Sequence, residues 1–152
     1  MKIVVIGDTH DNIQNIRHVM GFSEKIKAEA VIHTGDWSNL KTYKEIKSYK
    51  IKTYGVLGNA DISSEIKSKL DEFLELEIDN LKIGLIHNIK KLKLIENWKF
   101  KIENLDIVFC GHEHKQYQKN KFINPGSLEN DINFAIFDTK TKRVEFINND
   151  KI

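Results

Sequence analysis

The segment KIVVIGDTHD (residues 2–11) combines a predicted buried strand with the polar groups of a predicted site. Its first half, Lys2–Ile6, is a short β-branched run that stops at Gly7, which is typical of a strand inside a parallel sheet. Its second half places Asp8 and His10 directly after that strand. Because ligands of open α/β sheets bind beyond the carboxyl ends of the strands, the segment predicts an α/β fold with a site at this strand end.

The same arrangement recurs along the chain, where polar side chains follow further predicted strands. We expect these side chains to meet at one rim, since parallel strands end on the same side of a sheet. Imidazole, carboxylate and amide groups gathered in this way suit divalent transition metals. The candidate metal ligands are Asp8, His10, Asp36, Asn59, His87, His112 and His114, and the strands that precede or contain them are 2–6, 30–33, 51–57, 81–87 and 106–110.

The remaining patterns predict helices outside a mixed sheet or outside two packed sheets. Asp79-Asn80 separates two strand-like runs and is typical of a tight hairpin turn. No linker or repeat divides the sequence, so residues 1–152 are predicted to form a single domain. The expected helices are one capped by Asn12 and those over 40–49, 63–70 and 92–100, and the expected hairpins pair 73–78 with 81–87 and 133–137 with 143–147.

The composition narrows the class of protein. The 152 residues carry 24 Lys and Arg against 22 Asp and Glu, a net charge of +2, which argues against a nucleic-acid coating protein. The single cysteine, Cys110, excludes an internal disulfide and a multi-cysteine zinc site. No stretch approaches the ~18 apolar residues of a membrane span, and the first strand lacks the pattern of a signal peptide. A cytoplasmic protein that does not bind membranes is therefore expected.

Each candidate ligand also has a structural interpretation when it is taken alone. The two aspartates fit helix-capping turns, Asn59 fits a left-handed turn, and His87 fits a buried core histidine. The run His112-Glu113-His114 favours a metal site, because two imidazoles two residues apart after a glycine can both turn inward. The joint placement of all seven residues at strand ends favours the metal interpretation for the whole set.

Seven ligands are too many for one ion but suit two ions that share one carboxylate. Two metals ~3.5–4 Å apart can hold a hydroxide between them and clamp a phosphate for in-line displacement. Two divalent ions, two aspartates and one hydroxide leave a net charge of about +1, which attracts a phosphate anion and stabilises the charge that builds up on it.

Five short motifs resemble, in the order in which they occur along the chain, those of the calcineurin-like metallophosphoesterases. The resemblance runs from residue 2 to about residue 147. Asn124-Pro125-Gly126-Ser127 further resembles a mark of the small prokaryotic YfcE-type phosphodiesterases. The resemblance implies a four-layer αββα sandwich, in which two mixed β-sheets pack face to face with flanking helices. The motifs are Gly7-Asp8-Thr9-His10, Gly35-Asp36, Gly58-Asn59, His87 and Gly111-His112-Glu113-His114.

The family pattern also implies a role for each matching residue. The ions would be divalent, with Mn as the first choice and Ni, Co, Fe or Zn as alternatives. A water or hydroxide held between them would be the nucleophile, and Asp36, Asn59 and His112 are the predicted catalytic residues. The first ion would be bound by Asp8, His10 and His114, the second by Asn59, His87 and His112, and both by the bridging Asp36.

Three departures from the family pattern affect the expected chemistry. Ala60 stands where many members have a histidine that assists the leaving group, so substrates whose leaving group needs little help are favoured. The segment Ile86-His87-Asn88 replaces a more usual Gly-His-Gly, which predicts a less open loop. The short chain has no room for a capping domain, which predicts an open, shallow cleft.

Residues next to the motifs carry weaker predictions. Asp11, Asn12 and Asp61 would either orient imidazoles or form caps and turns. His33 is expected to be a buried structural histidine, with support of a metal ligand as the alternative, and Trp37 would wall the cleft or stack a base. Pro125-Gly126 would form a type II turn.

Three functions remain open on the sequence alone. The leading prediction is an enzyme that hydrolyses a small phosphodiester. The alternatives are a non-catalytic protein-binding scaffold, similar to the small scaffold subunit of the retromer coat, and a nuclease. Asp36 and Asn59 are intact, which favours catalysis, and the net charge near zero argues against a nuclease. The oligomeric state stays open, with a homodimer among the alternatives.

Overall fold

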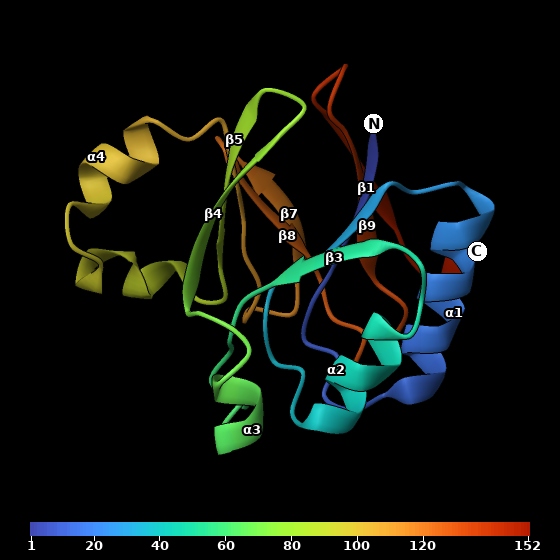
Figure 1. Ribbon diagram of the computed structural model, residues 1–152. Coiled ribbons are helices and arrows are strands. Elements are labelled where there is room, and N and C mark those ends of the chain that lie inside the picture. Colours follow the sequence, from blue (N-terminus) through green and yellow to red (C-terminus); the bar gives the residue numbers. More distant parts are fainter.

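A computed structural model describes residues 1–152 as two five-stranded β-sheets with helices on their outer faces (Figure 1). The first sheet has the strand order β10-β9-β1-β2-β3, and the second has the order β4-β5-β6-β8-β7. The elements are β1 (Lys2–Ile6), α1 (Ile13–Lys25), β2 (Ala30–His33), α2 (Leu40–Lys47), β3 (Lys52–Gly55), α3 (Ser64–Lys67), β4 (Phe73–Ile78), β5 (Leu81–Ile86), the 3₁₀ helix η1 (Ile89–Leu94), α4 (Trp98–Glu103), β6 (Ile107–Phe109), β7 (Gln116–Lys119), β8 (Phe122–Pro125), β9 (Phe134–Asp138), β10 (Arg143–Ile147) and the 3₁₀ helix η2 (Asn149–Lys151).

Both sheets are mixed, as predicted. In the first sheet β1, β2 and β3 are parallel, and β9 and β10 continue it as an antiparallel hairpin. In the second sheet β5, β6 and β8 are parallel, and β4 and β7 pair antiparallel to them at the two edges. The parallel strands of each sheet therefore end on one side, which is where the candidate ligands follow.

The alternation of side chains along β1 explains the layers. Ile3 and Val5 belong to the core between the two sheets, whereas Val4 and Ile6 face the opposite way into the core under α1 and α2. Every side chain in this set is fully buried, so β1 reads as a continuous apolar run. A third core, which includes Leu92 and Val108, packs η1 and α4 against the second sheet (Figure 1). The order of layers is therefore helix, sheet, sheet, helix.

Two local predictions agree with the backbone. Asp79 and Asn80 have φ angles of 53° and 65°, so both central residues of the β4–β5 turn are left-handed, as a type I′ hairpin requires. Gly126 follows Pro125 with a φ of 87°, the value that the third position of a type II turn needs.

The prediction of one helix over residues 92–100 was wrong. Residues Ile89–Leu94 form η1 and Trp98–Glu103 form α4, and the chain between them leaves the helical region. Ile95 is extended with a ψ of 131°, and Asn97 is left-handed with a φ of 57°. The apolar spacing on both sides of this break resembles a single helical face, which is why the sequence suggested one.

Several element boundaries also differ from the sequence prediction. The third strand ends at Gly55 rather than at residue 57, because the Leu57 N–H bonds to Asp71 outside the sheet. The helices expected over 40–49 and 63–70 are shorter, ending at Lys47 and Lys67. Strands β7 and β8 were not predicted, since each has only four residues and lysines flank them. No helix combines the length and apolar character that crossing a bilayer requires.

Candidate metal centre

The structure brings all seven candidate ligands together at the carboxyl ends of the parallel strands. Loops after β1, β2 and β3 supply four of them from the first sheet, and the loops after β5 and β6 supply three from the second. The floor of the centre is buried, since Asp8, Asp36 and His87 are at most 4% exposed. The four other ligand side chains are half-buried or exposed, so the centre opens to solvent on one side. These are His10, Asn59, His112 and His114.

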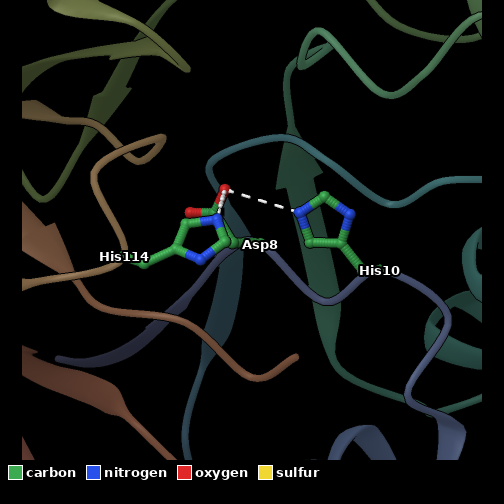
Figure 2. Close-up of side chains that lie close together, drawn as sticks. All are labelled: Asp8, His10 and His114. Atoms are coloured by element: carbon green, nitrogen blue, oxygen red, sulfur yellow. Dashed lines mark ion pairs between the residues drawn. The ribbon is translucent and has the colours of Figure 1, made fainter. Parts of the chain in front are cut away.

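The first cluster consists of Asp8, His10 and His114, whose ligand atoms lie within 4.8 Å of one another. Figure 2 shows the two imidazoles turned toward the Asp8 carboxylate from opposite sides. Asp8 Oδ1 lies 3.2 Å from His114 Nε2 and 4.0 Å from His10 Nε2. This is the set predicted for the first ion.

The second cluster lies on the other side of Asp36. Asp36 Oδ2 is 3.2 Å from His10 Nε2 and 3.3 Å from His87 Nε2, so the Asp36 carboxylate reaches both clusters. Asn59 Oδ1 lies 3.0 Å from His87 Nε2 and 3.1 Å from His112 Nδ1. The geometry thus puts Asp36 where a bridging ligand would stand, with Asn59, His87 and His112 beyond it.

Two orphaned atoms show that this donor set fits a cation. Asp8 Oδ1 and His10 Nε2 are buried and have no hydrogen-bond partner, although His10 Nε2 lies close to Asp36 Oδ2. A buried polar atom without a partner costs about 1–3 kcal/mol. His87 Nδ1 donates to the Thr34 carbonyl at 2.9 Å, so Nε2 faces Asp36 and Asn59, where the neutral ring would offer its lone pair to a cation. Carboxylate, amide and imidazole atoms that converge in this way are the donor set that divalent transition metals bind.

The two carboxylates differ in their electrostatic environment. Burial raises the pKa of Asp8, against the opposing effect of His87 and His114. Burial also acts on Asp36, but hydrogen bonds from His87 and from the Ala60 N–H lower its pKa to about 2. The pKa of His87 is raised, because its hydrogen bond to Asp36 and the nearby aspartates outweigh burial. Asp36 is therefore ionised at neutral pH, as a bridging ligand must be.

The backbone at the centre is unusual. A positive φ is uncommon for residues other than glycine and costs conformational energy that the surroundings must offset. Such strained positions cluster at functional sites more often than elsewhere. Five of the seven candidate ligands have one, namely Asp8 (47°), His10 (40°), Asp36 (61°), His112 (75°) and His114 (55°).

Asp61 holds the backbone of the centre rather than an imidazole. Its buried carboxylate accepts hydrogen bonds from the N–H groups of Asp36 at 3.0 Å, Ser38 at 2.8 Å and Gly58 at 2.7 Å. It thereby fixes the loops after β2 and β3 relative to each other. Of the two sequence interpretations of Asp61, the turn-forming one agrees with the structure.

Asp11 and Asn12 likewise contact no imidazole. Asp11 accepts a hydrogen bond from Thr42 Oγ1 at 2.7 Å and another from the Asn39 side chain, which ties the first loop to α2. Asn12 caps α1 by accepting the Asn15 N–H at 3.0 Å.

His33 and Trp37 form a buried support beneath the centre. His33 Nδ1 accepts the Gly35 N–H at 3.0 Å, so Nε2 carries the proton and donates to Thr9 Oγ1 at 3.0 Å. His33 is a buried structural histidine, as predicted. Trp37 is fully buried, stacks on His33 at 3.7 Å and donates from Nε1 to the Val56 carbonyl. The interpretation of Trp37 as a cleft wall or base-stacking residue was therefore wrong.

Three supporting contacts come from residues whose roles the sequence did not indicate. Ser127 Oγ donates to the Asp8 carbonyl at 3.0 Å, and Asn124 Nδ2 donates to the Gly111 carbonyl at 2.9 Å. Glu129 Oε2 lies 3.7 Å from His114 Nδ1, on the far side of that ring from Asp8. The Asn124–Ser127 segment was noticed only through its family resemblance, and nothing in the sequence singled out Glu129.

Comparisons with known proteins agree with this arrangement. Residues 1–142 match the family described as "Calcineurin-like phosphoesterase superfamily domain". The phosphodiesterase MJ0936 of Methanocaldococcus jannaschii is 30% identical over 161 aligned positions, covering 93% of this chain and 95% of that protein.

Solved structures show the same likeness. The structure of an archaeal phosphodiesterase superposes with a TM-score of 0.84 and 29% identity, covering 97% of this chain and 99% of the other. Two more distant structures share the fold. Vps29 of Entamoeba histolytica has a TM-score of 0.69 and 21% identity, with 97% and 99% of the two chains covered. The phosphoesterase YfcE of E. coli has a TM-score of 0.68 and 18% identity, with 97% and 98% covered.

Proposed function

Since this chain belongs to the calcineurin-like phosphoesterase superfamily and is a phosphoesterase, we propose that it hydrolyses small phosphodiesters with a pair of divalent metal ions. The observation that carries the proposal is the convergence of seven ligand side chains around buried atoms of Asp8 and His10 that lack any hydrogen-bond partner. Mn is the proposed ion, with Ni, Co, Fe and Zn as alternatives, and the proposed location is the cytoplasm.

The chain's own residues would divide the work between holding the ions and orienting the ester. When bound, the two ions would supply an activated water for in-line attack and would neutralise the charge of the phosphoryl group. Asp36 would be shared, because its carboxylate lies within 3.3 Å of an imidazole from each cluster. The ligands of the first ion would be Asp8, His10 and His114, and those of the second Asn59, His87 and His112.

Two further groups set the limits of the reaction. Asn59 presents Oδ1 to His87 and His112, which leaves its amide N–H groups free to donate to a phosphate oxygen. Ala60 has no side chain that could protonate a leaving alkoxide, and its N–H is taken by Asp36 Oδ1 at 2.8 Å. We therefore expect activated aryl diesters to react faster than dialkyl diesters.

The test is the hydrolysis of bis(4-nitrophenyl) phosphate by protein supplied with each of the five ions. Chelation by EDTA should abolish activity, and readdition of the ion should restore it. Asp36→Asn should lower kcat/KM by ~100-fold or more while the circular dichroism spectrum stays unchanged. Wild-type activity in that variant would overturn the bridging role of Asp36.

The two alternative functions predict different outcomes. A scaffold similar to Vps29 in fold predicts protein that shows no activity with any of the five ions, whether or not it binds them. A nuclease predicts that single-stranded or double-stranded nucleic acid is cleaved at least as efficiently as the small diester. Activity assays with each of the five ions and incubation with both nucleic acids separate these cases.

A further inference from the structure

A pocket of about 310 Å³ opens directly beside the candidate metal centre. It lies between the segment that follows β3 and the 3₁₀ helix η1. Asn59 and His87 belong to both the pocket and the centre, so a molecule held at the centre has direct access to the pocket. The volume is large enough for a substituted aromatic ring but small for a folded macromolecular segment.

The pocket lining contains both covered and exposed apolar side chains. Leu57, Phe73 and Ile86 are half-buried or buried. Ile62 and Leu94 stand at the rim and are 76% and 77% exposed, two of the four large hydrophobic side chains that the fold leaves in water. Exposed apolar groups gathered at a concave surface mark binding sites more often than isolated ones do.

The charged groups in the pocket lining balance one another. Lys67 and Lys91 line the pocket together with Glu72 and Asp61, two cations against two carboxylates, so the lining is close to neutral. The Asp61 carboxylate is occupied by three backbone N–H groups.

We propose that this pocket binds a ring-bearing ester arm of the substrate, and specifically the arm that stays on phosphorus. The inference rests on the proposed function, since it names the substrate class of the same centre. In-line displacement directs the leaving arm away from the attacking water, which would be supplied by ions at the centre. The pocket instead lies beside Asn59 and His87, two side chains that would hold those ions. The preferred substrates are thus phosphodiesters with one aromatic or similarly flat apolar arm in addition to the leaving group.

The kinetic test compares two diesters that share a leaving group. Bis(4-nitrophenyl) phosphate and methyl 4-nitrophenyl phosphate both release nitrophenolate and differ only in the arm that remains. In Ile62→Ser and Leu94→Ser, the ratio of kcat/KM for the aryl over the methyl diester should fall ~5–10-fold, mainly through KM, because apolar contact area is lost. Comparing ratios between variants cancels the different intrinsic reactivities of the two esters.

Phe100→Ser is the matched control. Phe100 is 69% exposed, lies on α4 and does not line the pocket, so the substitution removes an equally exposed apolar group elsewhere. This variant should keep the wild-type ratio. All three positions are exposed, so the thermal midpoints of the variants should stay close to that of the wild type.

A binding measurement makes the pocket testable without hydrolysis. Phenylphosphonate added to zinc-loaded protein should shift the methyl resonances of Ile62 and Leu94, and methylphosphonate should not. An unchanged kinetic ratio in both pocket variants, with methyl 4-nitrophenyl phosphate still hydrolysed, would overturn the pocket assignment alone. If the wild type hydrolyses neither diester, the proposed function fails, and the resonance shifts decide whether the pocket binds a ring.

Discussion

At the scale of single residues, Asp61 holds two loops of the centre with one buried carboxylate. Asp61→Ala would leave three backbone N–H groups without an acceptor, and we expect the free energy of unfolding to fall by ~3 kcal/mol. Asp61→Asn should cost less, because an amide oxygen in place of Oδ2 can still accept from Asp36 and Gly58. Urea denaturation measures both values, and equal losses in the two variants would contradict this account.

The residues of the centre also show what a sequence can and cannot reveal. Asp36 and His87 were identifiable because each comes at the end of a predicted strand, and parallel strands end on one side. The lack of a hydrogen-bond partner at Asp8 Oδ1 was not predictable, since it depends on His10 in the same loop and on His87 and His114 in two other loops. The position of Glu129 beside His114 was not predictable either, since Glu129 lies outside every motif in the sequence.

At the scale of elements, glycines in the loops that follow the strands let neighbouring loops approach closely. A Cβ atom at Gly58 would stand 2.1 Å from Asp36 Oδ1 and 2.3 Å from the Asp36 nitrogen. Gly58→Ala should therefore displace Asp36 and weaken metal binding and hydrolysis by ~10-fold or more. Titration of the metal-free variant with Mn, followed by calorimetry, measures the loss of affinity.

Gly21→Ala is the control for this substitution. Gly21 lies inside α1, where an added Cβ would meet nothing within 4 Å. Because alanine favours the helix over glycine, we expect this variant to be more stable by about 0.5–1 kcal/mol with unchanged activity. Comparable losses of metal affinity in both variants would show that Gly58 has no special role at the centre.

Elements with strong local signals were predictable, and those whose limits depend on tertiary contacts were not. β1 and the β4–β5 hairpin were identified because apolar runs and the Asp79-Asn80 turn specify them locally. The break between η1 and α4 was missed, since it depends on the left-handed Asn97 within an otherwise helical spacing. The pocket was also not foreseeable, because Ile62 and Leu94 meet only in the folded chain.

At the scale of the whole molecule, metal binding should stabilise the fold. An unfolded chain cannot assemble ligands from five separate loops, so the proposed ions would bind almost only to the native state. At a free ion concentration of about 100 times Kd, the gain in stability is about 2.7 kcal/mol for each site. Differential scanning calorimetry should show a higher thermal midpoint with Mn for the wild type and a much smaller rise for Asp36→Asn. Equal rises would place the bound ions elsewhere.

The origin of the ligands has a mechanical consequence. Asp8, Asp36 and Asn59 extend from the first sheet, whereas His87 and His114 extend from the second. A pair of ions held between them would act as a cross-link, and the distance between its ligands would depend on the relative position of the two sheets. Substitutions in the core between the two sheets, far from any ligand, should then lower the rate of catalysis before they cause the protein to unfold.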